Sequence, residues 1–142
     1  NVVTDLAVSP DEQKLVVITT EGAALWDVDT MQLVQRVLLQ RAMCATFAGD
    51  EIYVGTEDGV VHRLDHDLNL LNSSFVGDLV QGLRYDAGSA ILLVNTFRGE
   101  VQANFLHSGK TQSVHHSGGR KPCFVYKGND MYVSNGKGLV PL

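Results

Sequence analysis

The feature that most constrains this chain is a glycine-ended turn that returns at a nearly constant distance along its 142 residues. The turn glycines are Gly22, Gly59, Gly99 and Gly138, so the spacings are 37, 40 and 39 residues. A second turn precedes each glycine, and short apolar runs such as LVVIT and IYVG fill the segments between turns. A period of about 40 residues with several short strands per unit is typical of propellers and solenoids.

Within each unit the sequence favours strands over helices. Gly, Asp, Asn and Ser interrupt almost every window of ten residues, and β-branched residues crowd the segments between them. In the first three units we expect strands at 2–8, 14–19, 23–27, 32–37, 41–47, 51–55, 60–64, 69–75, 79–85, 90–95, 100–105 and 111–116. In the fourth unit we expect only three, at 122–126, 131–134 and 139–142. The prediction is an all-β protein.

The turns and strand ends of these units resemble the WD40 repeat. That repeat combines a turn like Ser-Pro-Asp-Gly, an Asp-Gly turn and a strand that ends in Trp-Asp. The matching residues here are Ser9-Pro10-Asp11, Trp26-Asp27, Asp58-Gly59 and Leu64-Asp65. Later units depart from the pattern, with Arg98-Gly99, Asn104-Phe105 and Lys137-Gly138, and the Gly-His pair that usually opens a repeat is absent. The resemblance implies a β-propeller segment of about three and a half four-stranded antiparallel blades, at 1–38, 39–76, 77–117 and 118–142, the last incomplete.

The stretch GTEDGVVHRLD, residues 55–65, is expected to hold a structural hairpin turn. Gly59 would permit the positive φ that a tight turn requires. In WD40 repeats a buried hydrogen-bond network joins the turn Asp, a Ser or Thr, a His and the Trp. Thr56 and Asp58 match two of those places, so we expect at most a partial network.

Three and a half blades cannot close a ring, because propellers close with about four to eight blades. The first expected strand begins at residue 2, which leaves no spare outer strand to complete the last blade. We therefore expect the sequence to be a segment of a longer propeller-containing chain. The alternative is that a second copy supplies the missing blades. Either way, the faces of the terminal blades would be apolar and uncovered, which favours association.

Composition narrows the function classes. Hydrophobic residues make up 44% and charged residues 19%, which suits a packed core. The net charge is −5 with scattered acidic residues, so the basic stripe of a nucleic-acid-binding protein is missing. Cys44 and Cys123 lie 79 residues apart and are expected to be buried reduced thiols, which favours an intracellular (cytoplasmic or nuclear) protein. No apolar run approaches the roughly 20 residues of a membrane-spanning helix, so no membrane role is expected.

Candidate chemistry is sparse. His62 and His66 are expected to lie on a strand and its following turn, and His115 and His116 are adjacent on an outer strand. Neither pair has the Cys or carboxylate partners of a zinc site, so we expect no metal and no cofactor. No nucleophile elbow or phosphate-binding loop occurs, so we expect no catalytic residues. The sequence favours a non-catalytic protein-protein interaction scaffold. The alternative is a ligand-binding or enzymatic propeller whose central-channel site is completed by blades outside this segment.

The candidate partner-binding residues are an aromatic and several cations at one side of the expected blades. Phe97 and Arg98 occupy a turn where WD40 repeats prefer small or acidic residues. Arg120 and Lys121 follow in the next link, and Arg41 lies in an earlier one. Aromatic residues and arginine are enriched among interface hot spots. We expect a patch suited to an acidic peptide or protein surface. The alternative is that Phe97 covers its own blade edge and Arg98 is merely solvated.

Overall fold

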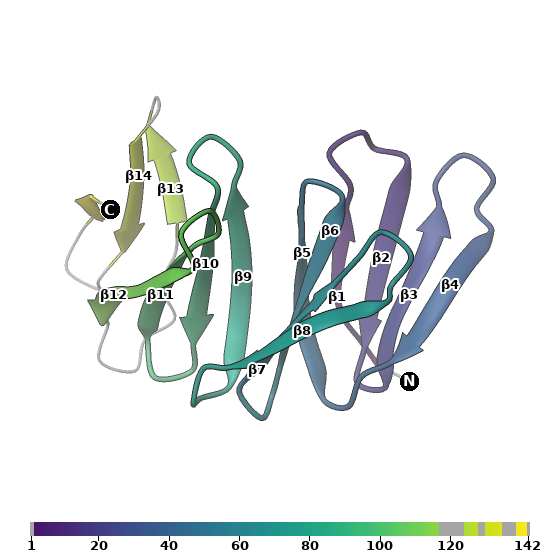
Figure 1. The fold of residues 1–142 in the computed structure, drawn as a ribbon, viewed down its shortest axis with the longest axis horizontal. Coiled ribbons are helices and arrows are strands. Elements are labelled where there is room, and N and C mark those ends of the chain that lie inside the picture. Colours follow the sequence, from purple (N-terminus) through teal and green to yellow (C-terminus); the bar gives the residue numbers. More distant parts are fainter. Residues whose placement is uncertain (1, 117–123, 128–129, 135–138, 142) are drawn as a thin grey trace.

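The structure is a computed structural model that describes residues 2–116, 124–127, 130–134 and 139–141. Figure 1 shows its strands, which form four antiparallel sheets in chain order. The first sheet contains β1 (Val3–Val8), β2 (Lys14–Thr19), β3 (Gly22–Asp27) and β4 (Leu33–Leu38). The second contains β5 (Ala42–Ala48), β6 (Glu51–Thr56), β7 (Val60–Leu64) and β8 (Leu70–Phe75). The third contains β9 (Val80–Asp86), β10 (Ile91–Thr96), β11 (Glu100–Phe105) and β12 (Lys110–His116). The fourth contains β13 (Phe124–Lys127), β14 (Asp130–Ser134) and β15 (Leu139–Pro141).

The all-β prediction is confirmed, and every expected strand is present with bounds that agree within two residues. Within the described residues three sheets have four strands and the fourth has three, as the repeat predicted. None of these sheets closes on itself, and the arrangement fits a segment of a β-propeller. The described residues include no helix long and apolar enough to cross a membrane.

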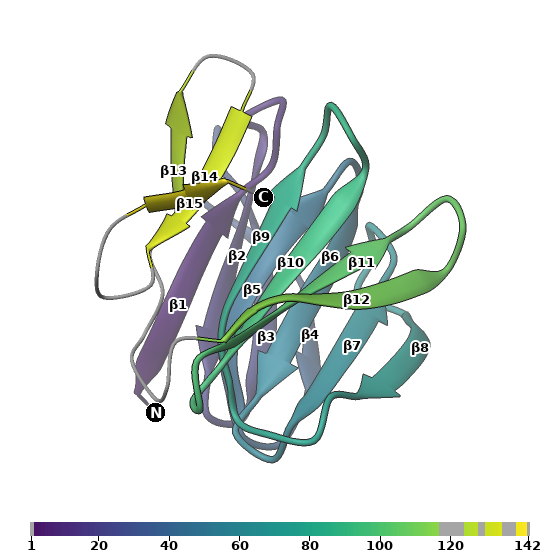
Figure 2. The same cartoon turned by 90° about the vertical axis from the view of Figure 1, so that its left-hand side faces the viewer.

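The first three sheets stack face to face through their inner strands. Strands β1 and β2 contact β5, and strands β5 and β6 contact β9. Figure 2 shows β1, β5 and β9 running in a similar direction at the successive interfaces. Both faces of strand β6 are buried, which explains why its segment IYVG is apolar without interruption. Ile52 and Val54 join the core toward the first sheet, whereas Tyr53 joins the core toward the third.

The sheets pack closely enough that one position needs glycine. A Cβ on Gly55 would lie 2.4 Å from the Cγ1 of Val80 and 2.8 Å from the Sγ of Cys44. Cys44 is buried, as predicted, and its thiol donates to the carbonyl of Val80 at 3.6 Å. Cys123 lies outside the described residues. Gly55 therefore sets the spacing between the second and third sheets.

The inner strands of the first three sheets, β1, β5 and β9, repeat one irregularity. Each has a register shift near its start, which leaves an extra residue at Thr4, Met43 and Gln81. These equivalent bulges align the positions of β1, β5 and β9 residue by residue. The alignment shows that one face of β1 is uncovered. The apolar residues on this β1 face are Val3 (55% exposed), Leu6 (57%) and Val8 (54%), and their counterparts on β5 are Ala42 (0%), Ala45 (6%) and Phe47 (9%).

Two edges of the stacked sheets carry the connections. The upper edge, at the top of Figure 1, holds the turns β1–β2 and β3–β4 and their counterparts in the second and third sheets. The lower edge holds the turns β2–β3, β6–β7 and β10–β11 together with the links between sheets. Backbone hydrogen bonds tie each link to the turns beside it. The amide of Glu57 donates to the carbonyl of Arg41 at 2.8 Å, and the amide of Phe97 donates to that of Leu79 at 2.9 Å.

Candidate interaction surfaces

The β10–β11 turn on the lower edge contains two of the predicted partner-binding residues. Phe97 is 58% exposed, and Arg98 is exposed beside it. The turn backbone is nevertheless fixed, because the amide of Arg98 donates to Oδ2 of Asp78 at 2.9 Å and that of Gly99 donates to the carbonyl of Thr96 at 3.0 Å. An exposed aromatic and a cation therefore stand on a rigid support.

The equivalent β6–β7 turn of the second sheet follows the partial network predicted for it. The Thr56 hydroxyl donates to Oδ1 of Asp58 at 2.5 Å and accepts from the amide of Val60 at 3.0 Å. Gly59 has the expected positive φ of 86°. The hydrogen bond of His62 goes elsewhere, since its Nδ1 lies 2.8 Å from the hydroxyl of Ser73 on β8. Thr56 is thus fully buried and fully bonded.

The third sheet lacks this network. Thr96 occupies the place of Thr56 and is 1% exposed, but its hydroxyl has no hydrogen-bond partner among the described residues. Two positions after Thr96 the chain has Arg98, where the second sheet has the acceptor Asp58. A buried hydroxyl without a partner destabilises a fold by about 1–3 kcal/mol. The Phe97–Arg98 turn therefore departs from the arrangement that would stabilise it best.

Arg41, another of the predicted cations, lies further from Phe97 than Arg98 does. Arg41 is exposed on the same edge but one repeat away, at the link that contacts the acidic turn of Glu57 and Asp58. It has a positive φ of 60°. Arg120 and Lys121 lie outside the described residues. The described part of the predicted patch is thus the Phe97–Arg98 turn, with Arg41 as a neighbour along the edge.

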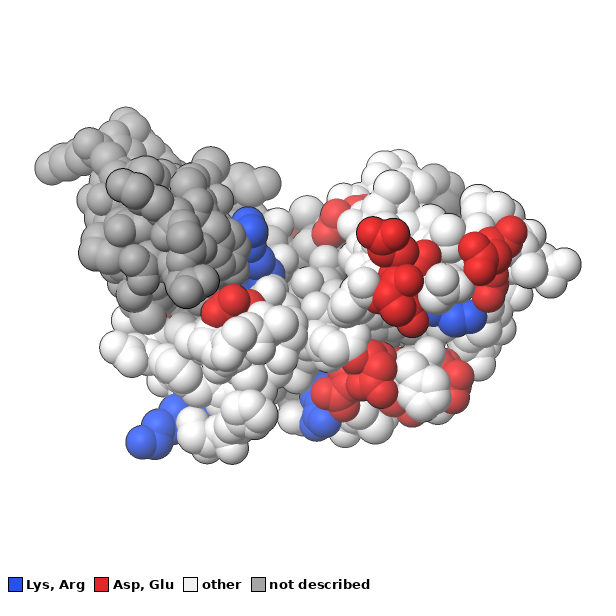
Figure 3. Space-filling view, turned by 90° about the horizontal axis from the view of Figure 1, so that it is seen from above, with Lys and Arg blue, Asp and Glu red and all other residues white. Residues whose placement is uncertain are grey.

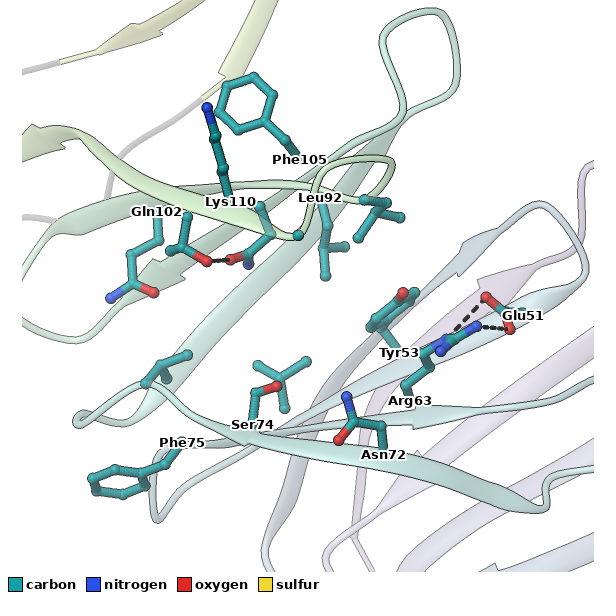
Figure 4. Close-up of a pocket in the computed structure, with 16 residues that line it drawn as sticks. Glu51, Tyr53, Arg63, Asn72, Ser74, Phe75, Leu92, Gln102, Phe105 and Lys110 are labelled. Carbon is teal, nitrogen blue, oxygen red and sulfur yellow. Dashed lines mark hydrogen bonds and ion pairs between the residues drawn. The ribbon is translucent and has the colours of Figure 1, made fainter.

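A second candidate surface is a cavity of about 700 Å³ between the outer halves of the second and third sheets. Figure 4 shows the Arg63 guanidinium paired with both carboxylate oxygens of Glu51 on one wall, at 2.6 and 3.1 Å. The pKa of Tyr53, on the same wall, is raised by burial. Asn72 and Ser74 from β8 and Gln102 from β11 provide uncharged polar groups. Glu51 neutralises Arg63, so the wall from the second sheet offers mainly uncharged polar groups, whereas Lys110 of β12 adds a cation to the lining from the third sheet.

We find no candidate metal site within the described ranges. These residues contain no group of three His, Cys, Asp or Glu side chains that could hold an ion. His62 lies on β7, and His66 lies in the following turn with its Nε2 3.3 Å from Oδ2 of Asp67. The backbones of His115 and His116 belong to β12.

Comparison with known proteins identifies the fold and no family. No protein-family profile matches the chain. No curated protein matches it either. Among solved structures, 1062 chains match, so the fold is too widespread to indicate a function by itself. A chain of the Kuenenia stuttgartiensis hydrazine synthase matches with a TM-score of 0.77 and 12% identity, over 92% of this chain and 44% of that one. The computationally designed Ika4 protein matches with a TM-score of 0.76 and 18% identity, over 100% of this chain and 91% of that one.

The chain thus spans less than half the length of the hydrazine synthase chain but nearly all of Ika4. At these identities the likeness concerns the fold alone.

Proposed function

We propose that the chain is a segment of a WD40-like β-propeller that acts as a non-catalytic scaffold in a protein complex, and that its Phe97–Arg98 turn contacts an acidic peptide or protein surface. The propeller part of the proposal is supported by the repeated sheets, the shared inner-strand bulge and the uncovered β1 face. The counterparts of that face on β5 are buried against a preceding sheet. By the same logic β1 is covered by another blade, from the parent chain or from a second copy.

The main support for this binding site is the Thr96 hydroxyl, which has no hydrogen-bond partner among the described residues. An Asp or Asn at position 98 would satisfy it, as Asp58 satisfies Thr56 in the second sheet. The chain instead has an exposed aromatic followed by an arginine, which give the turn little stability. Positions where a protein departs from a locally favourable arrangement concentrate at functional sites. Phe97 and Arg98 are also of residue types that dominate interface hot spots.

The proposed contact extends along the lower edge. Arg120 and Lys121 follow the third sheet in sequence, and Arg41 lies one link earlier. Arg98 beside the exposed Phe97 supplies positive charge, which suits carboxylates on a partner. An acidic segment with one apolar side chain would place that side chain against the exposed Phe97 ring and its carboxylates near the cations.

The test uses fluorescence anisotropy to measure how the whole chain binds a fluorescein-labelled peptide. In this peptide several glutamates surround one leucine. The double variant Phe97→Ala with Arg98→Ala is expected to weaken binding at least about fivefold, which corresponds to about 1 kcal/mol, without lowering the melting temperature. Glu57→Ala is the matched control, because Glu57 is an exposed residue at the equivalent turn of the second sheet. No saturable binding, or an equal loss of affinity in the control, would overturn the proposed site.

A further inference from the structure

An apolar groove opens on the upper edge between the first and second sheets. Its volume is about 530 Å³. Leu25 of β3 and Phe47 of β5 line its floor, and Val34 of β4 forms an exposed apolar wall. The turns β1–β2 and β5–β6 border it on the inner side, and the turn β7–β8 borders it on the outer side. The groove is therefore long enough to cross the edge from an inner turn to an outer strand, and no described side chain of this chain fills it.

The rim of this groove is acidic. Asp11, Asp50 and Asp67 each come from a different turn and all line the opening. The one lysine in the lining, Lys14, is already paired with Asp27, with Nζ 3.2 Å from the carboxylate. Figure 3 shows the wider setting, in which acidic side chains gather on the upper edge over the first and second sheets. A ligand in the groove would thus meet an apolar floor and a negatively charged rim.

The three rim carboxylates differ in their contacts. The carboxylate of Asp11 stabilises its own turn, since its Oδ1 accepts from the Ser9 hydroxyl at 2.6 Å and from the amide of Gln13 at 3.0 Å. The first of these bonds is the main reason that the pKa of Asp11 lies below its usual value, so this carboxylate stays ionised at neutral pH. Asp50 and Asp67 are exposed at turn tips, and Nε2 of His66 lies 3.3 Å from Oδ2 of Asp67. They are available to a partner.

From the apolar floor and the charge of the rim, we propose that this groove binds a short linear segment of a protein partner in which an apolar side chain is flanked by Lys or Arg. The apolar side chain would lie against Phe47 and Val34, and the cations would lie beside Asp50 and Asp67. A nucleic acid would be repelled by the carboxylates, and a purely apolar ligand would gain nothing from them. The groove is on the opposite edge from the Phe97–Arg98 turn, so a basic segment and an acidic one could be bound together.

The experiment titrates the whole chain into a fluorescein-labelled peptide in which arginines flank one leucine in a Gly-Ser background. Saturable binding is expected to weaken with added salt, because exposed charges are screened. The variant Asp50→Asn with Asp67→Asn should weaken it about tenfold or more, as expected for the loss of two charge pairs. Asp11 is left intact because it holds the turn. Asp29→Asn is the matched control, being an exposed upper-edge acid outside the groove, and should change affinity less than about twofold.

A second peptide separates the groove from general attraction to the acidic edge. Replacing its leucine by serine should weaken binding about fivefold or more, since the contact with the apolar floor is lost. The Phe97→Ala, Arg98→Ala variant should bind the basic peptide as the original chain does, which keeps this test independent of the lower-edge site. Absence of saturable binding, equal affinity for the serine peptide, or an equal loss in Asp29→Asn would each overturn the proposal.

Discussion

The unpartnered Thr96 hydroxyl gives a stability prediction whose sign can be worked out from the second sheet. Replacing Arg98 by Asn places a side-chain carbonyl two residues after Thr96, where Asp58 stands relative to Thr56. Asn is preferred to Asp as the main variant, because Oδ2 of Asp78 already lies 2.9 Å from the backbone nitrogen of residue 98. A second carboxylate there would be repelled by the first.

The expected size follows from the hydrogen bond that is restored. Supplying a neutral partner to a buried hydroxyl is worth about 1 kcal/mol, at the low end of the range for unsatisfied groups because the turn itself is exposed. For a chain of this length that corresponds to a rise of about 3 °C in melting temperature. Arg98→Asp should gain less than Arg98→Asn at low salt and approach it at high salt, since screening weakens its repulsion from Asp78.

Thermal and urea unfolding followed by circular dichroism provide the measurement, with three controls. Arg98→Ala removes the arginine without adding an acceptor, so it should not gain stability. Asp58→Ala should lose about 1–2 kcal/mol, because it breaks the bond that Thr56 makes. In a Thr96→Val background the benefit of Arg98→Asn should vanish, because the hydroxyl that it satisfies is gone. If Arg98→Asn were no more stable than Arg98→Ala, the interpretation of this turn would be refuted.

Two further predictions concern the β1 face and the half-buried imidazole of His62. The 142-residue chain by itself should self-associate through the β1 face, and Leu6→Glu should make it monomeric in sedimentation velocity, whereas Leu38→Glu on the exposed outer strand β4 should leave association unchanged. Burial lowers the pKa of His62, so the unfolded chain takes up its proton first as pH falls. The stability that His62 contributes is therefore complete above the unfolded pKa of about 6.5 and is lost as pH falls through the lower folded value. Urea unfolding between about pH 7.5 and about pH 5 should show a smaller loss of stability for His62→Gln; an equal loss would exclude this role.

The strands could be predicted from sequence because their signals are local. Gly59 and Gly99 end turns with a positive φ of 86° that few other residues adopt, and short apolar runs such as LVVI, IYV and ILLV lie between the turns. Strand β2 was predicted at its observed bounds, Lys14–Thr19, since turn residues flank an unbroken apolar run. The missing Trp in the second repeat did not disturb the prediction, because Leu64 fills the same buried place by packing alone.

The candidate surfaces were harder to predict because they depend on which repeats become neighbours. The sequence identified Phe97 and Arg98 as unusual for their turn, but the unpartnered Thr96 hydroxyl is visible only once burial is known. The acid-rimmed groove was missed altogether. Phe47 and Val34 belong to different repeats, and nothing in either segment indicates that they line one opening.

The sequence did contain a signal for the acidic edge, which a count of charges along the chain obscures. The 16 acidic residues look scattered when read in order. Each repeat, however, returns to the same edge at its first and third turns, and acids recur there: Asp11, Glu12, Asp27, Asp29, Asp50, Glu51, Asp65, Asp67 and Asp86. A repeat fold therefore converts a weak preference at one turn position into a charged edge that spans several sheets. In such a chain, charge is better read by position within the repeat than by position along the sequence.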